Sequence, residues 1–147
     1  DHAMEYSEDK GLIMVRLHQD EDIFEALEEA CRACDVRTGV FLSGIGMLKQ
    51  AELSFFVRQG RYATVLFPEP LELVSLTGNV ILQDGQYHFH THAVLAKQTK
   101  EAVAGHLSRG KVNVTNEIVI LKTDVPARRT MEETTGLMAM TFKREDG

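Results

Sequence analysis

The feature that most constrains the fold is a succession of strand-like runs that fills most of the chain after residue 38. The runs are rich in β-branched, aromatic and other apolar residues and are separated by glycine, proline, asparagine or aspartate, which is typical of strands joined by turns. Asp84-Gly85 separates two of the runs and predicts a tight hairpin. We expect strands over residues 11–18, 39–43, 51–57, 62–67, 71–82 and 86–96, and around 112–121 and 136–142.

One main helix is predicted near the N-terminus. Asp22 followed by Glu25 three residues later is a helix-start pattern, and the helix should run to about Asp35. A short helical or irregular piece is expected over residues 98–105. The predicted fold class is therefore α+β, a single compact domain that is mainly antiparallel β-sheet.

The length of 147 residues fits one domain with its own core. We interpret residues 1–4 as a cloning remnant that ends at a native start, Met4, and residues 5–147 as the domain. The chain has no apolar run long enough to span a bilayer and no signal-peptide pattern. We therefore expect a cytoplasmic protein with no membrane partner.

The charge balance argues against direct binding of nucleic acid. The chain has 22 acidic and 16 basic residues and a formal net charge of -6. Affinity for DNA comes largely from Lys and Arg side chains that neutralise phosphates, and no basic cluster in the sequence is longer than a pair such as Arg128-Arg129. We expect direct DNA binding to be weak or absent.

The two cysteines form the motif C-R-A-C, with Cys31 and Cys34 at its ends. A redox role would place this pair at the start of a helix that follows a strand. Here the pair falls late in a helical pattern, in which Ile23, Leu27 and Ala30 precede Cys34 at helical spacing. We expect both thiols to pack in the core as small apolar groups.

The stretch S-G-I-G at residues 43–46 superficially suggests a phosphate-binding loop. It lacks the third glycine and the following helix pattern of a dinucleotide-binding fingerprint. We expect it to form a tight turn between two strands.

Three histidines, His88, His90 and His92, alternate in the run H-F-H-T-H. On a strand they share one face, but the outer two are about 13 Å apart at their bases, so an H-x-H pair with a further ligand from elsewhere suits a metal ion better. His106 is the natural third ligand, because Gly105 before it could let the chain swing back over the strand face. A solvated polar sheet face is the alternative interpretation of the same residues.

The same residues belong to a set of motifs that resembles a known family, the plants-and-prokaryotes-conserved (PPC) domain. H-T-H-A-V-L, A-G-H-L-S-R-G-K-V and E-I-V-I are similar to its core motifs, F-L-S-G-I-G-M-L-K-Q-A-E-L to its glycine-containing strand end, and L-E-L-V-S-L-T-G-N to its glutamate-bearing strand. The resemblance runs from Gly11 to Phe142 and is to stand-alone prokaryotic members, of the type called DNA-binding protein with PD1-like motif.

The resemblance implies a homotrimer with a metal, often zinc, held by the H-x-H pair and the histidine of the G-H-L motif. Those ligands correspond to His90, His92 and His106, with His88 as an alternate. Zinc or another divalent transition metal is the cofactor that the resemblance implies. Ala104 departs from the family, which usually has glycine there, and the chain lacks the R-G-R-P AT-hook that precedes the domain in plant proteins.

Two functions remain open at this point. The first is a metal-binding homotrimeric module that recognises a protein or small-molecule partner, within the regulation of gene expression that the family's naming implies. The second is a metal-dependent enzyme, a lyase similar to acetolactate decarboxylase, whose fold is related to the PPC domain. Candidate catalytic groups are Glu72, Glu117 and Arg109. An enclosed cavity that holds a carboxylate and a cation beside the metal would favour the enzyme, and an open metal face would favour the module.

Overall fold

A computed structural model describes residues 3–142. In this range the chain forms one α-helix and a series of β-strands, which confirms the predicted α+β class. The elements are β1 (Glu5–Asp9), β2 (Leu12–His18), α1 (Ile23–Ala33), β3 (Thr38–Arg58), β4 (Arg61–Phe67), β5 (Leu71–Gln83), β6 (Gln86–Ala96), β7 (Ala102–Thr123), β8 (Ala127–Met131) and β9 (Met138–Phe142).

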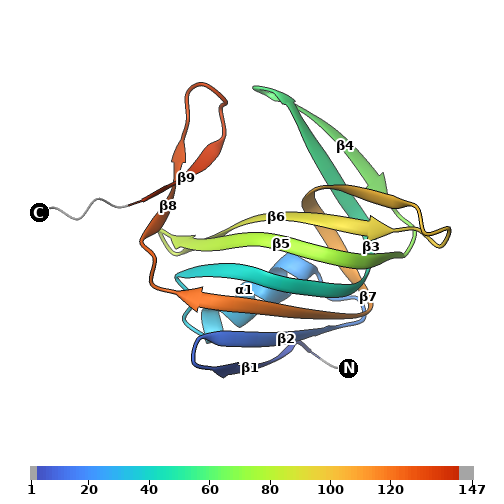
Figure 1. Ribbon diagram of the computed structural model, residues 1–147, viewed down its shortest axis with the longest axis horizontal. Coiled ribbons are helices and arrows are strands. Elements are labelled where there is room, and N and C mark those ends of the chain that lie inside the picture. Colours follow the sequence, from blue (N-terminus) through green and yellow to red (C-terminus); the bar gives the residue numbers. More distant parts are fainter. Residues whose placement is uncertain (1–2, 143–147) are drawn as a thin grey trace, which may run out of the picture.

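The main sheet is antiparallel and has the strand order β1-β2-β7-β6-β5-β3-β4 (Figure 1). The two longest strands, β3 and β7, also pair directly with each other, so that β7, β6, β5 and β3 close into a ring. Closure leaves only β1 and β4 at the edges of this sheet, and unpaired strand edges are otherwise sites of unwanted association. The predicted hairpin at Asp84-Gly85 is confirmed, and both residues have the positive φ that this turn requires (52° and 75°).

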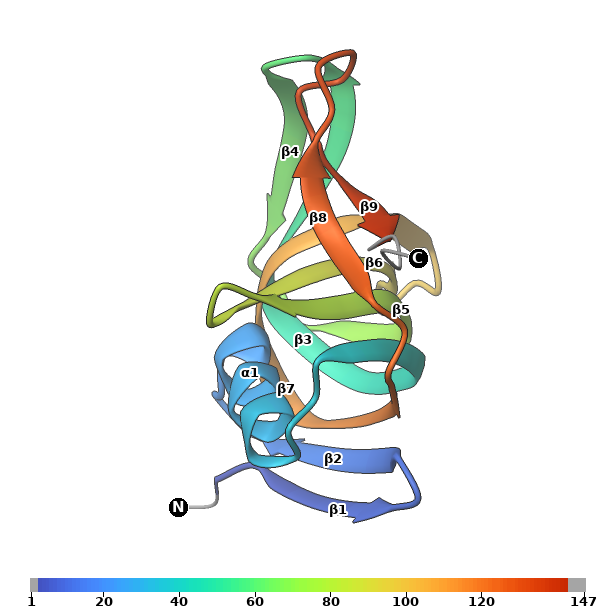
Figure 2. The ribbon, with the colours of Figure 1, turned by 90° about the vertical axis from the view of Figure 1, so that its left-hand side faces the viewer.

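The helix α1 lies against β2 and β7 (Figure 2). It packs there with one apolar face, formed by Ile23, Ala26, Leu27, Ala30 and Cys31. Its start is as predicted: the Asp22 side chain accepts hydrogen bonds from the backbone N–H groups of Phe24 and Glu25. Leu27 is fully buried, and burial of such a side chain is worth about 1.5–3 kcal/mol.

Both cysteines are buried, free thiols, as predicted, and they belong to the same core. Burial, with a smaller contribution from Cys34, raises the pKa of the Cys31 thiol to about 12. At neutral pH this thiol is therefore protonated and acts as an apolar core group.

Two expectations about local structure were wrong. The predicted turn at residues 43–46 is part of the single long strand β3, where Gly46 has a φ of 141° and its backbone lies against that of Thr115. The irregular piece expected over residues 98–105 is confirmed for residues 98–101, but its extent to Gly105 was wrong, because β7 begins at Ala102 and continues to Thr123. In both places a glycine permits close packing of two backbones inside a sheet, and local sequence cannot distinguish this from a turn.

Two hairpins rise on the same side of the main sheet, beyond β6 (Figures 1 and 2). One consists of the end of β3 with β4, and the other of β8 with β9. They approach each other at their tips, where a Cβ atom on Gly136 would lie 2.8 Å from the Cγ atom of Gln59. The β8–β9 hairpin is joined to β5 by reciprocal hydrogen bonds between Gln83 and the backbone of Arg129 (2.8 and 3.0 Å).

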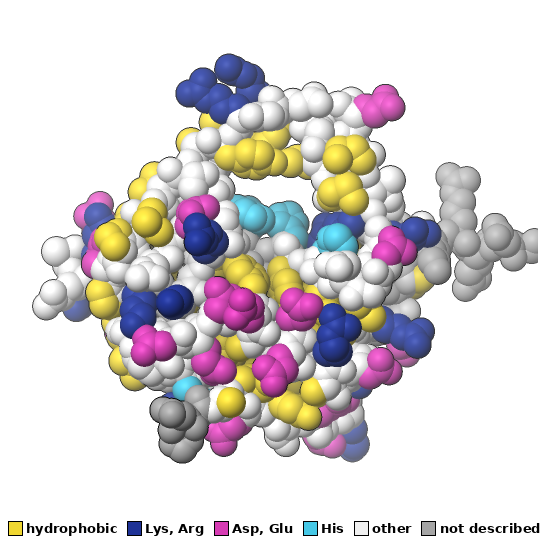
Figure 3. Space-filling view, turned by 180° about the vertical axis from the view of Figure 1, so that it is seen from behind, with side chains coloured by type: hydrophobic (Ala, Val, Ile, Leu, Met, Phe, Trp, Pro, Cys, Tyr) yellow, Lys and Arg dark blue, Asp and Glu magenta, His cyan; other side chains and the backbone are white. Residues whose placement is uncertain are grey.

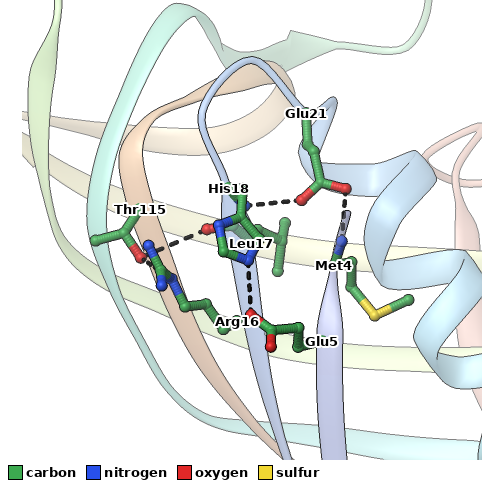
Figure 4. Close-up of polar contacts among 7 residues, drawn as sticks. All are labelled: Met4, Glu5, Arg16, Leu17, His18, Glu21 and Thr115. Carbon is green, nitrogen blue, oxygen red and sulfur yellow. Dashed lines mark hydrogen bonds and ion pairs between the residues drawn. The ribbon is translucent and has the colours of Figure 1, made fainter. Parts of the chain in front are cut away.

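The N-terminal strands are tied to the start of the helix by a polar network around His18 (Figure 4). The carboxylate of Glu21 accepts hydrogen bonds from the backbone N–H groups of Met4 (3.0 Å) and His18 (2.7 Å). The His18 ring pairs with Glu5 at 2.7 Å. This histidine therefore has a structural environment, apart from the alternating histidines of β6.

No helix within residues 3–142 is long and apolar enough to cross a membrane.

Candidate metal centre

The alternating histidines lie on β6, and the period of the strand sets their direction. His90 and His92 are exposed on one face, whereas Thr91 and Ala93 between and after them are buried on the other. Phe89 packs partly buried against the core on that second face. The strand alternation predicted from H-F-H-T-H is thus confirmed.

His106 reaches the strand histidines by direct strand pairing. It lies on β7 opposite His92 of β6 and, on its other side, opposite Ser54 of β3. The expectation that Gly105 would let a loop swing back was wrong, because Gly105 is a regular strand residue opposite Ala93. Its role is close approach: a Cβ atom there would lie 3.1 Å from the backbone oxygen of Ser54.

The three rings converge. Ring centroids are 5.2 Å apart for His90 and His92, 5.6 Å for His90 and His106, and 5.6 Å for His92 and His106. One nitrogen from each ring lies within 4.8 Å of the others, the arrangement of a group that could hold a metal ion. His88 lies on the same strand but outside this group.

The surroundings favour neutral imidazoles. His90 is exposed on its strand face, yet partial desolvation by the surrounding atoms, and then the positive charge of Arg129 and the neighbouring rings, lower its pKa. Burial, followed by His92, lowers the pKa of His106. A lower pKa leaves each ring uncharged at neutral pH with a lone pair available, the form in which imidazole binds metals.

The three histidines face a cavity of about 1010 Å³. Figure 3 shows it as a hollow with histidines at its base and apolar side chains above them. The polar lining includes the hydroxyls of Ser54 and Ser108, 2.9 Å apart, and that of Thr64, 3.0 Å from Ser54. The apolar lining comes from β6 and from both hairpins, and comprises Phe55, Phe56, Tyr62, Tyr87, Phe89, Leu137 and Met138.

The predicted catalytic candidates do not line this cavity. Glu72 is exposed on β5 opposite Ala96, and Glu117 is exposed on β7 opposite Arg16. Arg109 has a side chain that is 76% exposed and lies 3.7 Å from Glu52. Of the residues that the structure describes, no Asp or Glu lines the cavity.

The cation in the cavity is Arg129, which the sequence did not single out for this role. It comes from β8, is only 6% exposed, and donates a hydrogen bond to the side-chain oxygen of Asn79. The sequence signal was the unusual pairing of Arg128 and Arg129 on one short strand, where alternation directs one side chain inward and the other outward.

Comparison with known proteins agrees with this arrangement of strands and histidines. The family model of the Plants and Prokaryotes Conserved (PCC) domain matches residues 4–124. The chain belongs to this family, the PPC family that its sequence motifs resemble. The match covers all three converging histidines and most of the main sheet, and it stops before the β8–β9 hairpin that supplies Arg129.

Solved structures show the same PCC fold. A Bacteroides thetaiotaomicron protein whose name proposes DNA binding has a TM-score of 0.89 and 26% identity, over 97% of this chain and 100% of that one. A metal-containing protein from Archaeoglobus fulgidus has a TM-score of 0.80 and 26% identity, over 96% and 99%. A plant- and prokaryote-conserved protein from Pyrococcus horikoshii has a TM-score of 0.80 and 23% identity, over 99% of both chains.

A curated relative is much longer than this chain. The bifunctional protein GlmU of Synechococcus sp. (strain JA-2-3B'a(2-13)) is 30% identical over 107 residues, which is 73% of this chain. The matched part is only 16% of that protein. The similarity therefore concerns one region of a larger chain.

Proposed function

We propose that this PCC-domain protein is a homotrimer that holds one divalent transition metal ion per chain, zinc in particular, through His90, His92 and His106. The observation that carries the proposal is the convergence of three imidazoles at the base of one cavity. The Archaeoglobus fulgidus relative, which is called metal-containing, supports it.

The residues fit such an ion. Zinc binds imidazole nitrogens at about 2.0–2.1 Å, so two ligands of a tetrahedral ion are about 3.3 Å apart. The three nitrogens lie within 4.8 Å of one another, and small ring rotations reduce this spacing. The absence of a fourth protein ligand in the described group suits an ion with an exchangeable position.

The function that we infer is recognition of a partner at this site. An ion held by His90, His92 and His106 would supply Lewis acidity at this site. The chain's own groups define what can reach it: apolar side chains form the walls of the cavity, and the hydroxyls of Ser54 and Ser108 offer hydrogen bonds within it.

The exposed surface of the sheet supports assembly of the homotrimer. Leu12, Leu121 and Val40 face one another across β2, β7 and β3, and they are 39%, 39% and 38% exposed. Met14 and Leu42, on β2 and β3, are 60% and 55% exposed. Exposed apolar patches of this kind favour contact between copies of a chain.

We infer a regulatory role from the Bacteroides thetaiotaomicron relative, whose name proposes DNA binding. The acidic charge of this chain makes a partner-binding role within a regulatory assembly the better proposal than direct contact with DNA.

A metal-dependent lyase is the second candidate, and Arg129 in the cavity is the observation that favours it. Such an enzyme needs a group that relays protons beside the ion. The described lining contains no carboxylate, so the binding module is the preferred function.

Metal analysis tests the proposed site. Tag-free protein reloaded with zinc should contain about one ion per chain, measured by elemental analysis. Chelator competition should show that His106→Ala weakens zinc binding by at least about 10–100-fold, the loss typical of removing even a group that only hydrogen-bonds to a metal ligand. His88→Ala is the matched control and should retain zinc. Equal losses in the two variants would mean that the third ligand is wrongly assigned.

Light scattering tests the assembly separately. The mass should be three times that of the 16.5 kDa chain at micromolar concentration and without DNA. Met14→Glu and Leu42→Glu should lower the measured mass, whereas Val65→Glu on the β3–β4 hairpin should not. A monomeric mass for the unmodified protein would refute the trimer.

A further inference from the structure

Arg129 is a buried cation without a carboxylate partner among residues 3–142. Its residue is 6% exposed, and no Asp or Glu within the described range forms an ion pair with it. Arginine is rarely buried to this extent without an anion, because an uncompensated charge in a low-dielectric site is costly. The burial of the guanidinium lowers the pKa of Arg129, yet arginine remains charged at neutral pH.

The guanidinium is held in place by neutral groups. Gln83 fixes the backbone of Arg129 through two hydrogen bonds, and Asn79 accepts one from its terminal nitrogen. The remaining guanidinium nitrogens have no hydrogen-bond acceptor in residues 3–142. They are nevertheless not among the side-chain atoms that are both fully buried and without a hydrogen-bond partner. They are therefore accessible from the cavity that Arg129 lines.

Arg129 and the histidines face the same space. Asn79 lies directly opposite His90 in the pairing of β5 with β6, so the residue that positions Arg129 is adjacent to a proposed metal ligand. The charge of Arg129 also acts on His90. In Figure 3 a basic side chain is visible beside the histidines in the hollow. Among residues 3–142, Arg129 is the only Lys or Arg that lines the cavity.

The rest of the cavity suits an organic molecule. The walls are largely aromatic, with Phe55, Phe56 and Tyr62 from the β3–β4 hairpin and Leu137 and Met138 from the β8–β9 side. A volume of about 1010 Å³ is at the upper end of the range for small-molecule sites. Apolar walls with a few polar groups at one end are typical of sites that bind an amphipathic ligand.

We propose that this cavity binds a small organic carboxylate, with the carboxylate group at Arg129 and the apolar body against the aromatic walls. A single guanidinium matches one carboxylate through two parallel N–H···O bonds. A phosphate dianion would call for more cationic donors and would leave the apolar walls without a partner. The carboxylate of the ligand supplies the negative charge that no Asp or Glu among the described residues places beside Arg129. The contact with Arg129 stands by itself, whereas a second contact with the metal ion rests on the proposed function.

Benzoate is the probe for this site, and benzamide, of the same shape but uncharged, is its control. Zinc-loaded protein is titrated with each by calorimetry at pH 7.5, with inorganic phosphate as a third probe. We expect benzoate to bind at least about 10-fold more tightly than benzamide, because a hydrogen bond to a charged group is lost in the amide. Phosphate should bind more weakly than benzoate.

Two variants locate the effect. Arg129→Met should lower benzoate affinity by about 10- to 100-fold. Asn79→Asp keeps the arginine but gives it an internal carboxylate, and it should lower benzoate affinity to a similar extent. Circular dichroism and zinc content establish that each variant is folded and loaded.

The outcomes separate this proposal from the metal site. Loss of benzoate binding in both variants with zinc retained supports the Arg129 site. Unchanged benzoate affinity in folded Arg129→Met, or equal affinity for benzoate and benzamide, overturns it. If the unmodified protein takes up no zinc, the proposed metal function fails, and the same titrations on the metal-free protein still test Arg129.

Discussion

His92 and His106 are direct partners across the antiparallel pair of β6 and β7, with ring centroids 5.6 Å apart. Opposed residues in such a pair have Cβ atoms about 4.5–5.5 Å apart, so the backbone alone brings these two imidazoles together. His90 joins them from two residues along β6. The site therefore depends on the register of β6 with β7, and of β7 with β3.

Gly105→Ala tests this dependence. A Cβ atom at residue 105 would lie 3.1 Å from the backbone oxygen of Ser54, so β3 and β7 must separate slightly and displace His106. We expect a loss of about 1–3 kcal/mol in the free energy of unfolding, with weaker zinc binding. Urea denaturation and chelator competition measure the two effects. Ala104→Ser, at an exposed position of the same strand, is the control and should change neither.

Gly78 provides a stronger test of backbone contact. It has a φ of 138°, and a Cβ atom there would lie 1.9 Å from the backbone oxygen of His90. Gly78→Ala should therefore reduce the free energy of unfolding by at least about 3 kcal/mol, from backbone strain and steric conflict together.

Gly60 is the matched control for Gly78, because it has a positive φ of 78° but nothing within 4 Å of an added Cβ atom. Gly60→Ala should cost only the conformational term, about 1–2 kcal/mol. Thermal or urea denaturation of the two variants measures the difference. Similar losses for both would show that the close approach to His90 contributes little.

The parts of the fold that the sequence predicted are those with local signals. Asp22 as N-cap, the hairpin at Asp84-Gly85 and the common face of His90 and His92 each follow from patterns within a few residues. The two cysteines were placed in the core by helical spacing, and the structure buries both.

The parts that the sequence could not provide depend on pairing between distant segments. Gly46 and Gly105 are strand glycines at close backbone approaches, although a glycine in isolation indicates a turn as readily. The sequence offers Arg109 as a candidate catalytic group, but its side chain is exposed and does not line the cavity. Arg129 is the cation in the cavity because β8 packs beside β5 through Gln83. This contact joins segments that are distant in sequence, so no local pattern predicts it.

The thiols give a prediction about reactivity and pH. Since burial raises the pKa of Cys31 to about 12, its thiolate fraction at pH 8 is about one in 10,000, and Cys34 is shifted in the same direction by burial. Neither thiol should react with Ellman's reagent in the folded protein at pH 8, and both should react in guanidinium chloride. Rapid reaction of either one without denaturant would contradict the burial.

The same shift links stability to pH. Above about pH 9 the unfolded chain releases the Cys31 proton while the folded chain retains it. The contribution of the protonated Cys31 thiol to the free energy of unfolding is therefore complete below pH 9, and it is lost as the pH rises towards 12. Urea midpoints from pH 8 to 10.5 should fall less in Cys31→Ala than in the unmodified protein, after allowance for the lower starting stability of the variant.

The last prediction concerns DNA. The only adjacent arginine pair is not a surface patch, because Arg129 is buried in the cavity and only Arg128 remains exposed. With a net charge of -6, the chain should bind duplex DNA no more tightly than the non-specific range, about 10⁻⁴–10⁻⁶ M at physiological salt. Fluorescence anisotropy of a labelled duplex at 50 and 200 mM salt measures this, and any signal should fall steeply between the two. Arg128→Glu should reduce the signal slightly, since it removes at most one phosphate contact. A sequence-selective complex that persists at 200 mM salt would mean that assembly creates a basic surface which the single chain does not have.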